Sequence, residues 1–152
     1  MADGDLATLT AAVEAAAAQR FPGRRVTDLA VLPGGHSGLT HVATLAADGG
    51  DPVRCVVKST PPGRRPRGRH DVLRQARILG ALGRASRVPV PELLFEAPEP
   101  IPLFGMELVG GFAAEPVMEE PRPDETAAGV AAAWEAAVDL LVALQEPAPA
   151  DL

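Results

Sequence analysis

The sequence predicts an α+β fold: a five-stranded antiparallel sheet with one core-facing helix, an N-terminal helix and a long C-terminal helix. Short apolar runs separated by turns rich in Gly, Pro and Asp occupy its middle part, as is typical of antiparallel strands. Three other segments have the apolar spacing or the alanine content typical of helices. The length of 152 residues and the 47% hydrophobic content are sufficient for a packed core.

The first half of the chain predicts one helix followed by three strands. The helix is expected over residues 5–19, where Leu6, Leu9 and Val13 lie among alanines, and Phe21-Pro22-Gly23 ends it. Alternating or β-branched runs then predict strands over residues 26–32, 40–45 and 53–57. The last two are separated by a segment of strong turn chemistry at residues 46–52, which favours a meander.

The second half predicts two more helices and two more strands. Asp71 is a candidate N-cap for a helix whose apolar face carries Val72, Ala76, Leu79 and Leu82, with Gln75 on the same face. Strands are expected over residues 92–95 and 103–109. An acidic, proline-rich connector at 116–123 leads to a helix over 124–145, where Trp134 is expected to be a core residue.

Charge and composition exclude several classes of function. The net charge is −6 and aromatic residues make up 3% of the chain, so we expect no nucleic-acid partner. The sequence has no apolar run of transmembrane length and no secretory signal pattern, so we expect no membrane partner and a cytoplasmic protein. The three histidines, His36, His41 and His70, lack metal-ligand spacing and are expected on the surface or in loops.

Lys58 is the single lysine among 14 basic residues, and it ends the apolar run that begins at Val53. Lysine is rarely buried, so its place at the end of a half-buried strand admits two interpretations. Its stem could pack along the strand while its ammonium reaches solvent. Alternatively, the site requires a compact ammonium rather than a forked guanidinium.

A glycine-rich turn precedes Lys58 in the chain. Gly34, Gly35 and Gly38 lack a Cβ, so the backbone N–H groups of this turn could approach a phosphate closely, and Ser37 could add a hydroxyl donor. A turn of this composition is equally compatible with a plain hairpin. The period of two places Lys58, Val56 and Arg54 on one strand face, so Lys58 could share a cleft with the turn.

The order of these segments resembles the N-terminal lobe of protein-kinase-like phosphotransferases, and most closely the aminoglycoside phosphotransferase family. The resemblance rests on Leu32-Pro33-Gly34-Gly35-His36-Ser37-Gly38-Leu39-Thr40, on Val56-Val57-Lys58, on the helix from His70 to Leu79, on Val88-Pro89-Val90-Pro91, and on Phe104 to Gly111. It departs from the family at two positions: Pro33 stands where the kinase pattern has its first glycine, and Gln75 stands where the family has a glutamate.

The resemblance implies an ATP site. In it, Lys58 would hold the α- and β-phosphates under the loop formed by Gly34, Gly35, Ser37 and Gly38, and Val56 would pack on the adenine. Gln75 cannot form the family's ion pair with Lys58, but its carbonyl can accept a hydrogen bond from the ammonium.

The same resemblance implies a hinge at residues 106–109. The backbone C=O of Glu107 and N–H of Val109 would bind the adenine edge, and Met106 would line the back of the pocket. Met106 as a plain core residue is an equally good interpretation. The family relationship divides the chain into a nucleotide-binding lobe at residues 1–111 and, at 112–152, a connector with the first helix of an incomplete C-terminal lobe.

The family's catalytic loop, of the type His-Gly-Asp…Asn, and its Mg²⁺-binding Asp have no match in the sequence. We therefore assign no catalytic or metal-binding residue, and expect Mg²⁺ and a small-molecule substrate only with a further lobe. Three interpretations stay open: a kinase fragment inactive alone, a non-catalytic nucleotide- or partner-binding module, and an α+β scaffold without nucleotide. Self-association is expected through an apolar stripe that includes Trp134, Val138 and Leu141.

Overall fold

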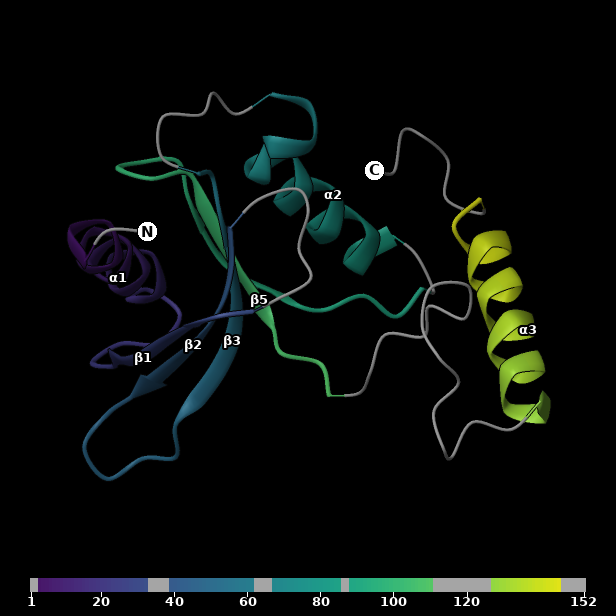
Figure 1. The fold of residues 1–152 in the computed structure, drawn as a ribbon, viewed down its shortest axis with the longest axis horizontal. Helices are drawn as coiled ribbons and strands as arrows, with labels where there is room; N and C mark the ends of the chain where they lie inside the picture. Colours follow the sequence, from purple (N-terminus) through teal and green to yellow (C-terminus); the bar gives the residue numbers. More distant parts are fainter. Residues whose placement is uncertain (1–2, 33–38, 62–66, 86–87, 111–126, 146–152) are drawn as a thin grey trace. The chain divides into compact units, whose positions relative to one another are not determined.

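The computed structural model describes residues 3–32, 39–61, 67–85, 88–110 and 127–145. Within these ranges the chain is α+β, with three α-helices, one 3₁₀ turn and a five-stranded antiparallel sheet (Figure 1). The elements follow in the order α1 (Asp3–Ala17), β1 (Arg25–Val31), β2 (Leu39–Ala46), β3 (Val53–Ser59), a 3₁₀ turn (Gly68–His70), α2 (Val72–Ala85), β4 (Leu93–Ala97), β5 (Leu103–Glu107) and α3 (Ala127–Ala143). None of the described helices combines the length and the hydropathy needed to cross a membrane.

The sheet has the strand order β1-β2-β3-β5-β4, and every neighbouring pair is antiparallel. Helices α1 and α2 lie on opposite faces of this sheet (Figure 1). Because side chains alternate along a strand, consecutive residues of β3 contribute to different faces. Val57 belongs to the core under α1, whereas Lys58 reaches a side chain of α2. The predicted sheet and its two flanking helices are therefore confirmed.

Helix α1 covers its face of the sheet with small and branched side chains. Leu9, Ala12, Val13 and Ala17 recur at helical spacing and are all nearly inaccessible to solvent. They pack on the buried strand residues of this face: Ala43, Leu45, Cys55, Val57, Phe95 and Leu103. The alanines of α1 allow a close approach between the helix and the sheet.

Glu14 of α1 ties the edge strand β1 to the helix. The register between β1 and β2 shifts between Val26 and Asp28, where the ladder is irregular. At this position the backbone N–H of Val26 donates to Glu14 Oε1 at 2.8 Å, and Arg25 lies 3.3 Å from the other carboxylate oxygen. The carboxylate thus satisfies a backbone donor at an irregular point of the sheet edge.

Helix α2 begins where the sequence predicts. Asp71 Oδ1 accepts a hydrogen bond from the backbone N–H of Arg74 at 2.9 Å, which is the geometry of an N-cap. Val72 and Ala76 are fully buried, and they pack with Phe104 of β5. This small cluster fixes the helix over the β5 side of the sheet.

The chain divides into two compact units, one of residues 1–80 and 91–108 and one of residues 81–90 and 109–152. The first unit contains the sheet, α1 and the larger part of α2; the second contains α3. The expectation that Trp134 is a core residue is wrong, because its side chain is 54% exposed. Apart from Glu135 and Asp139, the residues of this helix are apolar or small, so the sequence pattern did not distinguish a covered face from an exposed one.

The expectation of a surface or loop position is also wrong for His41. It lies in β2 and is fully buried on the α1 face, between Leu39 and Ala43 in the strand and opposite Val57 of β3. The structural reason is the strand period, which places His41 on the same face as the buried residues Ala43 and Leu45. His70 lies half-buried in the 3₁₀ turn, and His36 lies outside the described residues.

Candidate functional site

The strand register brings the base of the glycine-rich turn next to Lys58. Leu32 donates its backbone N–H to the C=O of Thr40 at 2.9 Å, which closes the hairpin between β1 and β2. Thr40 is in turn the direct cross-strand partner of Lys58. The predicted phosphate-binding residues of the turn, Gly34, Gly35, Ser37 and Gly38, lie outside the described residues.

Lys58 is held by α2 across the same face of the sheet. Its Nζ donates a hydrogen bond to Gln75 Oε1 at 2.8 Å, in a part-buried environment. The expected contact between the lysine and the amide carbonyl is present. A hydrogen bond to a charged group contributes about 1.5–3 kcal/mol, and this one links two elements that are separated by the segment from Thr60 to Asp71.

Burial lowers the pKa of Lys58 because the charged form is less well solvated in the fold than in water. Gln75 adds no negative charge, so the amide orients the ammonium without neutralising it. A site with an oriented and partly desolvated cation favours an anionic ligand, because the ligand's charge would replace the lost solvation.

The face of β2 next to Lys58 is only partly covered. Along β2, His41, Ala43 and Leu45 on the α1 face are buried, whereas Thr40 and Val42 on the Lys58 face remain partly accessible. Val42 lies opposite Val56 of β3, and Val56 lies opposite Met106 of β5. Three adjacent strands thus present an apolar row beside the lysine, which is the kind of surface on which a planar ring can pack.

Val56 and Met106 of this row differ in their burial and in their contacts. Val56 is 6% exposed, and Met106 is half-buried and packs against the cluster of Val72, Ala76 and Phe104 under α2. Met106 therefore makes the contact that is expected of a core residue.

The predicted hinge residues lie at the far end of β5 from Lys58. Lys58 pairs with Phe104, and Glu107 lies three residues further along β5, a separation of roughly 10 Å at the rise of an extended strand. The backbone N–H of Glu107 donates to the C=O of Glu92 at 2.9 Å. Val109 belongs to the second unit, and its side chain is 61% exposed.

Thr40 is a site residue that the sequence interpretation did not single out. The sequence places it at the start of a strand and at the end of the glycine-rich motif, without a role in the site, although its cross-strand partner is the lysine. If the two strands of the predicted hairpin, β2 and β3, are paired across their turn, Thr40 falls opposite Lys58. No group of three or more potential metal ligands occurs among the residues that the structure describes.

The arrangement can bind an anion and can support a flat apolar group beside it. Lys58 supplies the charge, Gln75 supplies its orientation, and Val42 and Val56 supply the apolar surface. Comparisons with known proteins return no match, whether with family models, with curated proteins or with solved structures.

Proposed function

We propose that the chain is the ATP-binding portion of a small-molecule kinase similar to the aminoglycoside phosphotransferases, located in the cytoplasm. The observation that carries the proposal is the 2.8 Å hydrogen bond from Lys58 Nζ to Gln75 Oε1, which joins β3 to α2. It is the neutral counterpart of the lysine–glutamate pair of kinases. The order of elements agrees: hairpin, strand with lysine, helix, two strands.

In this proposal the nucleotide lies on the Lys58 face of the sheet. The ammonium contacts the phosphates, and the adenine packs on the apolar row of Val42, Val56 and Met106. The backbone of residues 107–109 contacts the adenine edge. The loop of Gly34, Gly35, Ser37 and Gly38 covers the phosphates, since Thr40, at the end of that segment, pairs with the lysine.

Such a lobe binds and orients the nucleotide, and phosphoryl transfer depends mainly on positioning and on neutralisation of charge. Mg²⁺ and the acceptor belong to a catalytic lobe in this proposal, and we assign no catalytic residue to the sequence. A second candidate is a non-catalytic nucleotide-binding module. Gln75 favours it, because a neutral amide cannot form the ion pair that holds the lysine of an active kinase.

The proposal is tested by titrating the chain with ATP, with and without Mg²⁺, by calorimetry and by thermal shift. We expect saturable binding in the millimolar range or tighter. Lys58→Met should weaken binding by roughly tenfold or more, the change expected when a charge-assisted contact is lost. Arg54→Ala is the matched control, because Arg54 lies on the same strand face and is exposed.

No heat and no melting shift at millimolar ATP would contradict a nucleotide site. Equal losses in Lys58→Met and Arg54→Ala would show that only the general positive charge matters. Neither candidate predicts transfer of phosphate to an added aminoglycoside by this chain alone, because no catalytic residue is assigned to it.

A further inference from the structure

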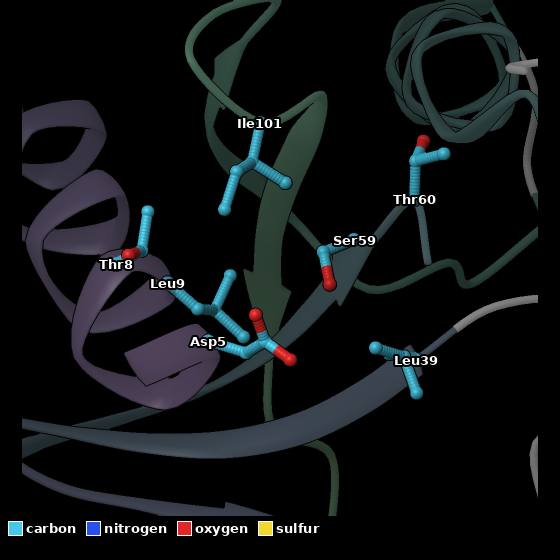
Figure 2. Close-up of a pocket in the computed structure, with 7 residues that line it drawn as sticks. All are labelled: Asp5, Thr8, Leu9, Leu39, Ser59, Thr60 and Ile101. Carbon is cyan, nitrogen blue, oxygen red and sulfur yellow. The ribbon is translucent and has the colours of Figure 1, made fainter. Parts of the chain in front are cut away.

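A cavity of about 160 Å³ lies between α1 and the ends of the central strands, on the α1 side of the sheet. Figure 2 shows it between the first turns of the helix and β2 and β3. The residues that line it are Asp5, Thr8, Leu9, Leu39, Ser59, Thr60 and Ile101. It lies on the α1 face, whereas Lys58 points to the other face.

Two residues that line the cavity carry buried hydroxyl groups. The side chains of Ser59 and Thr60 are almost completely buried, with only 1% and 5% of their surface exposed. Thr60 Oγ1 has no hydrogen-bond partner among the described residues. Figure 2 shows the Thr60 hydroxyl directed away from the other lining residues, so the hydroxyl of Ser59 is the one of these two that faces the cavity.

The charge of the lining is negative. Among the described residues that line the cavity, Asp5 is the only one with a formal charge. Figure 2 shows its carboxylate directed toward the hydroxyl of Ser59, so an acidic and a neutral acceptor face the same space. Leu9, Leu39 and Ile101 provide apolar surface around them.

The size of the cavity limits the occupant. An apolar cavity of about 150 Å³ accommodates a benzene-sized molecule, so about 160 Å³ admits roughly six non-hydrogen atoms. A nucleotide is far too large. From the charge, the hydroxyl of Ser59 and the apolar walls together, we propose that this cavity binds a small primary organic ammonium ion. Its ammonium donates to Asp5 and Ser59, and its short hydrocarbon chain packs on Leu9 and Ile101.

This inference does not depend on the nucleotide proposal, since the two sites use different faces of the sheet. The two nevertheless share strand β3, where Lys58 and Ser59 are consecutive residues. Failure of one proposal leaves the other standing.

The experiment uses three probes of similar size and different charge: n-butylammonium, 1-butanol and butyrate. Each is titrated into the full chain at pH 7 while amide chemical shifts are followed by NMR. We expect saturable shifts at the cavity residues, with the tightest binding for n-butylammonium and the weakest for butyrate. Each dissociation constant is expected in the millimolar range, because so few atoms make contact.

Two variants separate the contributions of the Asp5 carboxylate and the Ser59 hydroxyl to binding. Asp5→Asn should weaken n-butylammonium by about threefold or more and leave 1-butanol unchanged, as expected for loss of a partly exposed ion pair. Asp28→Asn is the matched control, because it removes one carboxylate from the exposed strand β1. Ser59→Ala should weaken both n-butylammonium and 1-butanol, because both use the hydroxyl.

Three outcomes would overturn the proposal. The first is the absence of saturable shifts with any probe, which would show that the cavity holds water only. The second is equal binding of n-butylammonium and butyrate, which would exclude the role of Asp5. The third is a preference for n-butylammonium that survives Asp5→Asn. Circular dichroism of each variant confirms that the fold is retained before binding is compared.

Discussion

Gly105 lies in β5 directly beneath the aromatic ring of Phe95 in the neighbouring strand β4. A Cβ at this position would overlap the ring of Phe95, and Phe95 belongs to the core under α1. Gly105→Ala is therefore expected to destabilise the fold by about 1–3 kcal/mol, the usual cost of overpacking. Chemical denaturation measures the change, and Gly49→Ala is unsuitable as a control because that glycine has a positive φ.

Gly83→Ala is a better control, since the nearest atom to a Cβ there is Val90 Cγ2 at 3.6 Å, an ordinary contact distance. Alanine also has the higher helix propensity, so this control should be neutral or slightly stabilising. Equal stabilities for the two variants would show that Phe95 can move away at little cost.

His41 makes the stability of the fold depend on pH. Burial lowers the pKa of His41, so in the folded chain the imidazole stays neutral at pH values where the unfolded chain already binds a proton. The contribution of His41 to the free energy of unfolding should therefore be constant above about pH 7 and should fall as the pH drops below about 6.5. The loss continues until the pH reaches the lowered pKa of the folded state.

Urea unfolding of the native chain and of His41→Leu between pH 8 and pH 5 tests this prediction. The leucine variant should lose the part of the pH dependence that begins near pH 6.5. His70→Gln is the control, because His70 is only half-buried in the 3₁₀ turn. An unchanged profile in His41→Leu would mean that carboxylates alone cause the acid sensitivity.

At the scale of the elements, strands β2 and β3 could be predicted from the sequence because their alternation is regular. In β3 the period of two placed Lys58 and Val56 on one face, and the helical period of α2 placed Gln75 on the face toward the sheet. The contact between the lysine and the amide was expected because Gln75 stands where the resembled family has the glutamate that pairs with this lysine. The two periodicities agree with that expectation, since they place both residues on facing surfaces.

The burial of His41 could not be predicted with the same ease. In β2 apolar residues occur on both faces, with Val42 on one and Leu45 on the other, so the alternation did not show which face carries α1. The cavity was equally hidden, because Asp5, Ser59 and Ile101 are distant in the sequence and meet only when α1 packs on the sheet. The periodicity of the sequence predicts which residues share one face of a strand or helix. A cavity depends on how well the faces of two elements fit together, and the periodicity contains no information on that fit.

At the scale of the whole molecule, the second unit contains a long helix with exposed apolar residues. Trp134, Val138 and Leu141 are 54%, 55% and 59% exposed, and they recur at helical spacing. A contiguous apolar surface of this kind favours association with a second copy. We expect the average mass in light scattering to rise with protein concentration.

The double substitution Trp134→Glu and Val138→Glu should shift this association to higher concentration by about tenfold or more, because it places charges in the apolar surface. Glu135→Gln on the same helix is the control for a change of charge outside that spacing. A chain that stays monomeric at all concentrations would contradict self-association through α3.

The alternation along β3 also limits how this protein can change in evolution. Lys58 and Ser59 lie on opposite faces of the sheet. The contact with Gln75 on one face and the cavity on the other therefore both depend on the number of residues from Val53 to Ser59. Deleting or inserting one residue in this strand would exchange the two faces. The lysine would then point beneath α1, among the fully buried Leu45 and Leu103, and Ser59 after a deletion, or Val57 after an insertion, would stand where Gln75 holds an ammonium. Insertions and deletions should therefore be tolerated in the turn at residues 47–52 and eliminated from the strand that follows it.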